Sequence, residues 1–144
     1  MNILIYDVAA SSSGALSVLQ EFHRTYSASA DNNKYFFVIS TPELAETDNI
    51  KVLRYPWIKK SWFHRLFFEY IYTLKIIDNY NISEILSLQN ITIPNTKLPQ
   101  TLYLHQPLPF VEHRFSFFSN KKFWVYQNII AIMIKHSVKK ANKV

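Results

Sequence analysis

The chain contains no cysteine and a single glycine among its 144 residues. Without cysteine it has no disulfide framework, no thiolate nucleophile and no cysteine-ligated metal site. Because Gly14 stands alone, backbone positions with φ > 0 must be filled largely by asparagine, which tolerates the left-handed region better than other residues with a side chain. Asparagines such as Asn81 and Asn95 stand between the periodic segments, where such turns are expected.

The sequence also has few long apolar runs. The longest aliphatic run near the C-terminus covers residues 129–134, about one third of a membrane span. At the N-terminus Asp7 interrupts the apolar run and no basic segment precedes it, so we expect no signal peptide. These features predict a cytoplasmic protein, soluble or peripheral at the inner face of the cell membrane.

Acidic residues are missing from the last part of the chain. Residues 1–112 contain nine lysines and arginines against ten acidic residues, so their net charge is −1, whereas the whole chain carries +6. The excess comes from Arg114, Lys121, Lys122, Lys135, Lys139, Lys140 and Lys143. A basic segment of this kind favours contact with phosphate, nucleic acid or an anionic membrane, and a solvated helix face is the alternative.

Short apolar segments alternate along the chain with longer segments in which apolar residues recur at helical spacing. Strands are expected at residues 2–8, 34–40, 50–55, 82–88 and 101–104, and helices at 15–26, 61–79 and 122–137. The strands are apolar on both faces, which is typical of a parallel sheet. Strands that alternate with helices predict an α/β fold, a Rossmann-like, mainly parallel sheet with helices on both faces. Residues 143–144 look like the start of a sixth strand, and one domain accounts for all 144 residues.

Polar residues follow several of these strands. Ser12 and Ser13 come after the first strand and open a helix, Gln89 and Asn90 follow the fourth strand, and the fifth strand ends at His105-Gln106. The carboxyl ends of parallel strands share one edge, where ligands of open α/β sheets bind. We therefore expect these residues to line one crevice, with the helix N-terminus suited to an anionic or hydroxyl-rich ligand.

Residues 57–65 combine two tryptophans with four basic or potentially basic side chains. Such a segment can lie at the boundary of lipid headgroups or stack on nucleic-acid bases. We expect it to contact a membrane surface through Trp57, Lys59, Lys60, Trp62 and Arg65. In the helix that follows, the stripe of Leu66, Tyr70, Leu74 and Ile77 is expected to be mostly core, with part of the helix left as an exposed patch.

The stretch Leu104-His105-Gln106-Pro107-Leu108-Pro109-Phe110 completes a pattern that resembles the N-terminal half of GT-B glycosyltransferases of the family-4 type. That pattern has a first strand, a small-residue loop, a helix, and a fifth strand ending in a His followed by Asp or Gln and often Pro. The ending Lys139-Lys140-Ala141-Asn142-Lys143-Val144 resembles the approach to the last strand of this half.

The resemblance implies roles for individual residues. His105 would be the catalytic histidine that contacts the donor sugar, and Gly14 with Ser12 and Ser13 would form the loop near the diphosphate and acceptor. Gln89, Asn90, Gln106, His113 and Arg114 would complete the acceptor site. Two departures stand out, since one glycine replaces the usual pair and Gln106 replaces the commoner aspartate.

The resemblance further implies the acceptor-side half of a bacterial glycosyltransferase that makes surface polysaccharide. The partner would be a saccharide or lipid-linked saccharide acceptor, with an anionic membrane surface as a second partner. No cofactor or metal is expected, the nucleotide sugar would be held by a second domain outside these 144 residues, and this chain alone is expected to be inactive. The alternatives are a non-catalytic α/β binding module for nucleic acid or membrane, or a flavodoxin-type binding domain.

Overall fold

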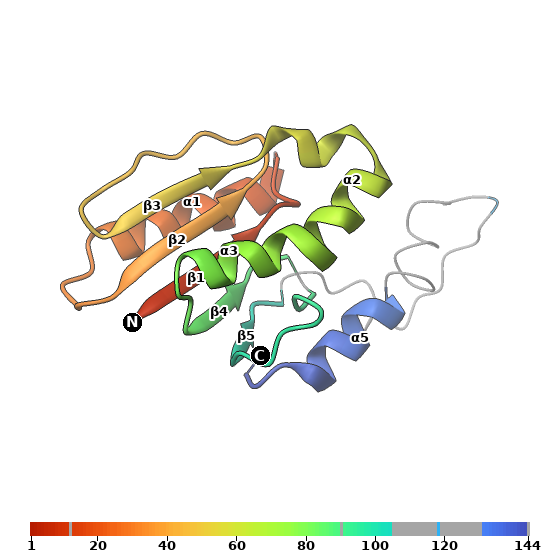
Figure 1. The fold of residues 1–144 in the computed structure, drawn as a ribbon. Helices are drawn as coiled ribbons and strands as arrows, with labels where there is room; N and C mark the ends of the chain where they lie inside the picture. Colours follow the sequence, from red (N-terminus) through yellow and green to blue (C-terminus); the bar gives the residue numbers. More distant parts are fainter. Residues whose placement is uncertain (12, 90, 105–117, 119–130, 144) are drawn as a thin grey trace.

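The computed structural model describes residues 1–11, 13–89, 91–104, 118 and 131–143 (Figure 1). Its centre is a five-stranded sheet in the order β3-β2-β1-β4-β5. Every strand pair in it is parallel. The strands are β1 (Asn2–Asp7), β2 (Lys34–Ile39), β3 (Ile50–Arg54), β4 (Glu84–Ser87) and β5 (Gln100–Leu102). The predicted α/β, Rossmann-like parallel sheet is thereby confirmed.

The strands form because their side chains are buried alternately on two faces. On β1, Leu4 and Tyr6 belong to one hydrophobic cluster and Ile5 to another, and all three side chains are fully buried. Successive side chains of a strand point to opposite faces, so an uninterrupted apolar run fits only a sheet covered on both sides.

Helices cover both faces of the sheet, as predicted (Figure 1). The helix α1 (Ser13–Ser27) packs through Leu19 against the face that contains Ile5. The opposite face is covered by η1 (Pro56–Lys60), α2 (Trp62–Phe67), η2 (Phe68–Tyr72) and α3 (Thr73–Asn79), with Phe68 and Ile76 in its core. The helix α5 (Ala131–Lys140) lies beside β5. No helix in the described ranges has the length and apolar character needed to cross a bilayer.

The predicted helix 61–79 is present, but the assignment of its core face was partly wrong. Leu66 and Tyr70 are 41% and 48% exposed, whereas Phe68 is fully buried. The cause is the wide turn η2, in which the Thr73 N–H bonds to the carbonyl of Phe68, five residues earlier. A turn of this kind contains one residue more than an ordinary helical turn. Residues that precede it are therefore rotated away from the face that a 3.6-residue period predicts from Ile77.

Asparagine does take the left-handed backbone positions, since Asn81 and Asn95 have φ of 51° and 61°. Strand bounds differ from the predicted ones by at most two residues, mostly because the strand ends pass into turns. The predicted start of a sixth strand is supported at Lys143, which forms a parallel bridge with Thr101. The Lys143 carbonyl accepts from the Leu102 N–H at 2.8 Å. Of the predicted helix 122–137, residues 122–130 lie outside the described part.

Candidate functional site at the carboxyl edge of the sheet

The sheet has its topological switch point between β1 and β4. From β1 the chain proceeds outward to β2 and β3, and it then returns to β4 on the other side of β1. Connections leave the two strands in opposite directions there, and in open α/β sheets the place outside the carboxyl ends of such strands is the usual ligand site. The residues at this place are Asp7, which ends β1, Val8 just after it, and Gln89 after β4, as the sequence predicted for Gln89.

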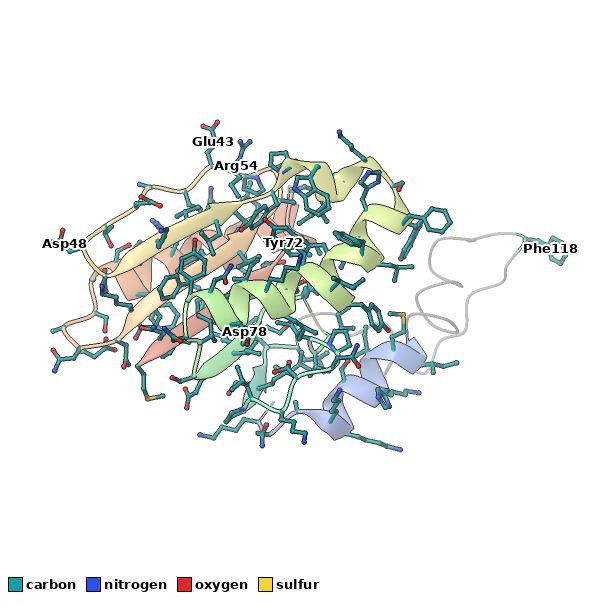
Figure 2. All side chains as sticks on the ribbon, viewed as in Figure 1. Glu43, Asp48, Arg54, Tyr72, Asp78 and Phe118 are labelled. Atoms are coloured by element: carbon teal, nitrogen blue, oxygen red, sulfur yellow. The ribbon has the colours of Figure 1, made fainter. Side chains whose placement is uncertain are left out.

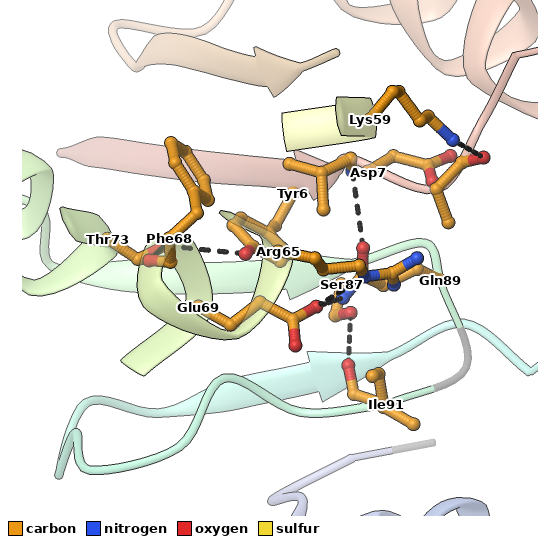
Figure 3. Close-up of polar contacts among 12 residues, drawn as sticks. Tyr6, Asp7, Lys59, Arg65, Phe68, Glu69, Thr73, Ser87, Gln89 and Ile91 are labelled. Carbon is orange, nitrogen blue, oxygen red and sulfur yellow. Dashed lines mark hydrogen bonds and ion pairs between the residues drawn. The ribbon is translucent and has the colours of Figure 1, made fainter. Parts of the chain in front are cut away.

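Gln89 ties the ends of the two strands together (Figure 3). Its Oε1 accepts from the Val8 N–H at 3.2 Å, and its Nε2 donates to Glu69 Oε1 at 3.1 Å. The side chain is only 8% exposed. Both ends of the amide are therefore engaged by the protein, and Gln89 connects the carboxyl ends of β1 and β4 with η2.

Glu69 is the polar residue that sequence reasoning missed. It is 6% exposed, and its Oε1 also accepts from Arg65 Nε at 3.2 Å. An acidic side chain in the apolar run Leu66-Phe67-Phe68-Glu69-Tyr70-Ile71 was the available signal, because buried carboxylates are almost always paired. One partner, Arg65, lies one helical turn before Glu69, and the other, Gln89, follows β4. Only the fold brings Gln89 and Glu69 together.

Lys59 lies against the loop after β1. Its Nζ donates to the carbonyl of Ala9, in the loop after β1, at 3.0 Å (Figure 3). Burial and, secondly, the Arg65 guanidinium lower the pKa of the Lys59 ammonium, while the Asp7 carboxylate acts to raise it. Lys59 is therefore a cation held at the carboxyl edge, not a free surface charge.

Lys59 and Arg65 line one hollow of about 240 Å³. The other lining residues are Ile58, Ser61 and Trp62. The geometry follows from local sequence: Pro56 starts the short turn η1, and Ser61 then caps α2, its Oγ accepting from the His64 N–H at 3.3 Å. Two cations beside one loop of the sheet edge can bind an anionic group such as a phosphate.

A hydrogen bond between two residues that lie close in the sequence stabilises the loop after β1. The buried Asp7 carboxylate accepts from the Ala10 N–H at 3.2 Å, and this contact bends the chain toward α1. Gly14 is exposed near the start of α1, and a Cβ there would meet nothing within 4 Å. Glycine is therefore not required at this place by packing or by φ.

The residues expected to contact a membrane differ in how the rest of the protein engages them. Trp57 packs against Phe68 and Tyr72, with ring centroids 5.6 and 5.7 Å apart. Lys59, Trp62 and Arg65 line the same hollow. Trp62 is 70% exposed, and Lys59 and Lys60 are both exposed. The exposed apolar patch expected on this helix is present and contains Trp62, Phe63, Leu66, Phe67, Tyr70 and Ile71.

Several predicted site residues lie outside the described residues. They are Ser12, Asn90, His105, Gln106, His113 and Arg114. Ser13 is the first residue of α1, which places it at the predicted edge. The described ranges contain no cluster of three His, Asp or Glu residues able to hold a metal ion.

Comparison of the chain with protein-family models, with curated proteins and with solved structures gives no match.

Proposed function

We propose that this chain is the acceptor-side domain of a glycosyltransferase that moves a sugar from a nucleotide sugar to a saccharide acceptor bearing a diphosphate, as lipid-linked acceptors do. The observation that supports the proposal is the hollow of Lys59 and Arg65, which the bond from Lys59 to the Ala9 carbonyl joins to the loop before α1 at the carboxyl edge of the sheet. The order of strands and helices and the motif around His105 also support the proposal, because they resemble the N-terminal half of a GT-B glycosyltransferase.

The chemistry assigns each part a task. In sugar transfer an acceptor hydroxyl forms a bond to the anomeric carbon, the bond from that carbon to the nucleoside diphosphate breaks, and the hydroxyl proton is released. Charge develops on the departing nucleoside diphosphate, whereas the acceptor diphosphate keeps its charge, so cations that hold the acceptor act by positioning its hydroxyl for attack. In the proposal Lys59 and Arg65 hold the acceptor diphosphate, and His105, three residues after β5, donates a hydrogen bond to a sugar hydroxyl.

The test is binding of a diphosphate sugar to the 144-residue chain. The probe is glucose joined to a methyl diphosphate, compared by calorimetry with methyl glucoside, which lacks the phosphates. The Lys59→Gln variant should weaken binding of the diphosphate probe about tenfold, because a charge-assisted bond is lost. Lys60→Gln is the matched control, since Lys60 neighbours Lys59 but does not line the hollow.

Equal loss in the two variants, or equal binding of both probes, would contradict the proposed acceptor site. Transfer of labelled sugar by this chain alone would contradict the division of labour between two domains, since no transfer is expected without a nucleotide-sugar domain.

A second candidate is peripheral binding to an anionic membrane, favoured by the exposed Trp62 and Phe63 beside Lys60. Sedimentation with anionic but not neutral vesicles, lost in Phe63→Glu, is the expected result. Binding that ignores vesicle charge, or that Phe63→Glu leaves intact, would remove this candidate. Nucleic acid is the remaining alternative, and a steep fall of polynucleotide affinity with salt would identify it.

A further inference from the structure

A second pocket lies on the other side of α2, between η2, the segment after β4 and α5. Its volume is about 330 Å³, near the lower end of the range of about 300–1,000 Å³ that ligand sites occupy. It shares no lining residue with the Lys59 hollow. Most of its described lining is apolar, contributed by Leu66, Tyr70, Ile91, Pro94, Ile132 and Met133.

The polar groups at the base of this pocket are engaged by the protein. The Glu69 carboxylate is paired with Arg65 and Gln89. The Ser137 hydroxyl oxygen accepts from the Thr92 N–H at 3.0 Å, which joins α5 to the segment after β4. Glu69 and Ser137 are themselves buried, so the surface that the pocket offers to an apolar chain is mostly that of its apolar walls.

The rim of the pocket is cationic. His136 and Lys140 of α5 line it and are exposed, and α5 also carries Lys135 and Lys139 but no acidic residue. Two of the acidic residues, Glu43 and Asp48, lie at the β3 end of the molecule, on the opposite side from α5 (Figure 2). Apolar walls below a cationic rim match a ligand with an apolar chain and an anionic head.

We propose that this pocket binds one anionic amphiphile, with its chain against Leu66, Tyr70 and Met133 and its phosphate or carboxylate head on Lys140 and His136. The site is separate from the acceptor site, and its existence does not depend on the proposed function. A bilayer lipid and a lipid-linked acceptor share this chemistry as sources of the ligand.

The test uses dodecyl phosphate below its micelle concentration and follows binding to the 144-residue chain by calorimetry. Saturable binding is expected, with affinity about tenfold or more above that for dodecyl maltoside, whose head is neutral, and with no measurable binding of inorganic phosphate. If geranylgeranyl phosphate displaces the bound dodecyl phosphate and dihexanoyl phosphatidylglycerol does not, the ligand is a polyprenyl phosphate. If only dihexanoyl phosphatidylglycerol displaces it, the ligand is a bilayer lipid.

The chain offers closely matched variants. Tyr70→Glu places a negative charge in the pocket, whereas Ile71→Glu places the same charge on the neighbouring residue, which is equally exposed but outside the lining (48% and 49%). Lys140→Glu and Lys139→Glu form a second pair of this kind on α5. Tyr70→Glu and Lys140→Glu should each lower the affinity about tenfold, and their controls should change it little.

Unchanged melting temperatures would show that the exposed substitutions leave the fold intact. The proposal is overturned if dodecyl phosphate does not bind saturably, if dodecyl maltoside binds equally well, or if each control variant loses as much affinity as its partner.

Discussion

The position of the Lys59 side chain depends on the residues that surround it in the fold. In the sequence it is one of several cations near two tryptophans, and we predicted that it faces a membrane. In the structure the turn η1 places its ammonium at the Ala9 carbonyl, near Arg65 and Asp7. The partial burial that this placement imposes lowers the pKa of Lys59, so the residue binds anions best below the ordinary titration range of lysine.

The pH dependence of anion binding tests this placement. The charged ammonium binds the anion, and its pKa is below the ordinary value of 10.5. Pyrophosphate affinity should therefore begin to fall, as pH rises, before an ordinary lysine would lose its proton. Lys59→Arg should remove that fall, because arginine keeps its charge. Calorimetry over the alkaline range up to pH 10.5 measures both, and identical profiles for the two proteins would contradict the prediction.

Asp31 gives a prediction for acid stability. The hydrogen bond from the Tyr35 hydroxyl, at 2.6 Å, is the largest cause that lowers the pKa of the Asp31 carboxyl below its ordinary value of 3.8. A carboxyl whose folded pKa is depressed stabilises the protein above its unfolded pKa, and that stability is lost as pH falls through the folded pKa.

The free energy of unfolding should therefore decrease as pH falls below about 3.8, and part of this decrease should vanish in Asp31→Asn. Tyr35→Phe should also weaken the pH dependence, because it removes the hydroxyl donor. Urea denaturation at a series of acidic pH values provides the measurement. If both variants keep the slope of the wild-type protein, the bond to Asp31 does not contribute to acid stability.

Among the elements, the wide turn η2 has the largest effect on the site. It brings Glu69 to Gln89 and turns Leu66 and Tyr70 outward. Thr73 stabilises the turn, because the Phe68 carbonyl accepts from its hydroxyl at 2.9 Å as well as from its N–H. The Tyr6 hydroxyl lies 3.4 Å from the Thr73 hydroxyl oxygen, and burial is the main cause that raises the pKa of Tyr6.

These three groups predict a non-additive pair of substitutions. Thr73→Val removes a bond from the Phe68 carbonyl and leaves the Tyr6 hydroxyl without this partner, so it should cost about 1–3 kcal/mol of unfolding free energy. Tyr6→Phe should cost about 1 kcal/mol. The double variant should cost less than the sum, because no tyrosine hydroxyl is then stranded. Equal values for the double variant and the sum, measured in urea, would refute the coupling.

The elements also show what the sequence can and cannot predict. Strands such as β1 and β2 are predictable because a short run of consecutive apolar residues, such as 35–39 in β2, is buried on both faces in a covered sheet. The exposed side of α2 and η2 was not predictable from a 3.6-residue period, because the Phe68–Thr73 bond changes that period. The pairing of Glu69 with Gln89 joins residues 20 positions apart, and no local pattern specifies such a contact.

At the scale of the whole molecule, the parallel pairing of the strands could be predicted, but the contacts between distant elements could not. Alternating strands and helices require parallel pairing, and polar residues after several strands then meet at one edge. Gln89 and Ser13 are at that edge, as the pattern predicted. Which of the edge residues face a ligand depends on packing between distant elements, and for this reason the contact of Lys59 with the loop after β1 was not anticipated and Glu69 was missed.

The most direct test of the account is to map where a diphosphate sugar binds. Backbone amide NMR spectra of the 144-residue chain, titrated with glucose joined to a methyl diphosphate, report the site residue by residue. We predict the largest shifts at Val8–Ala10, Lys59 and Arg65, around the carboxyl ends of β1 and β4. Shifts confined to the amino ends of the strands or to the β3 edge, with none at Lys59, would contradict an acceptor site at the carboxyl edge.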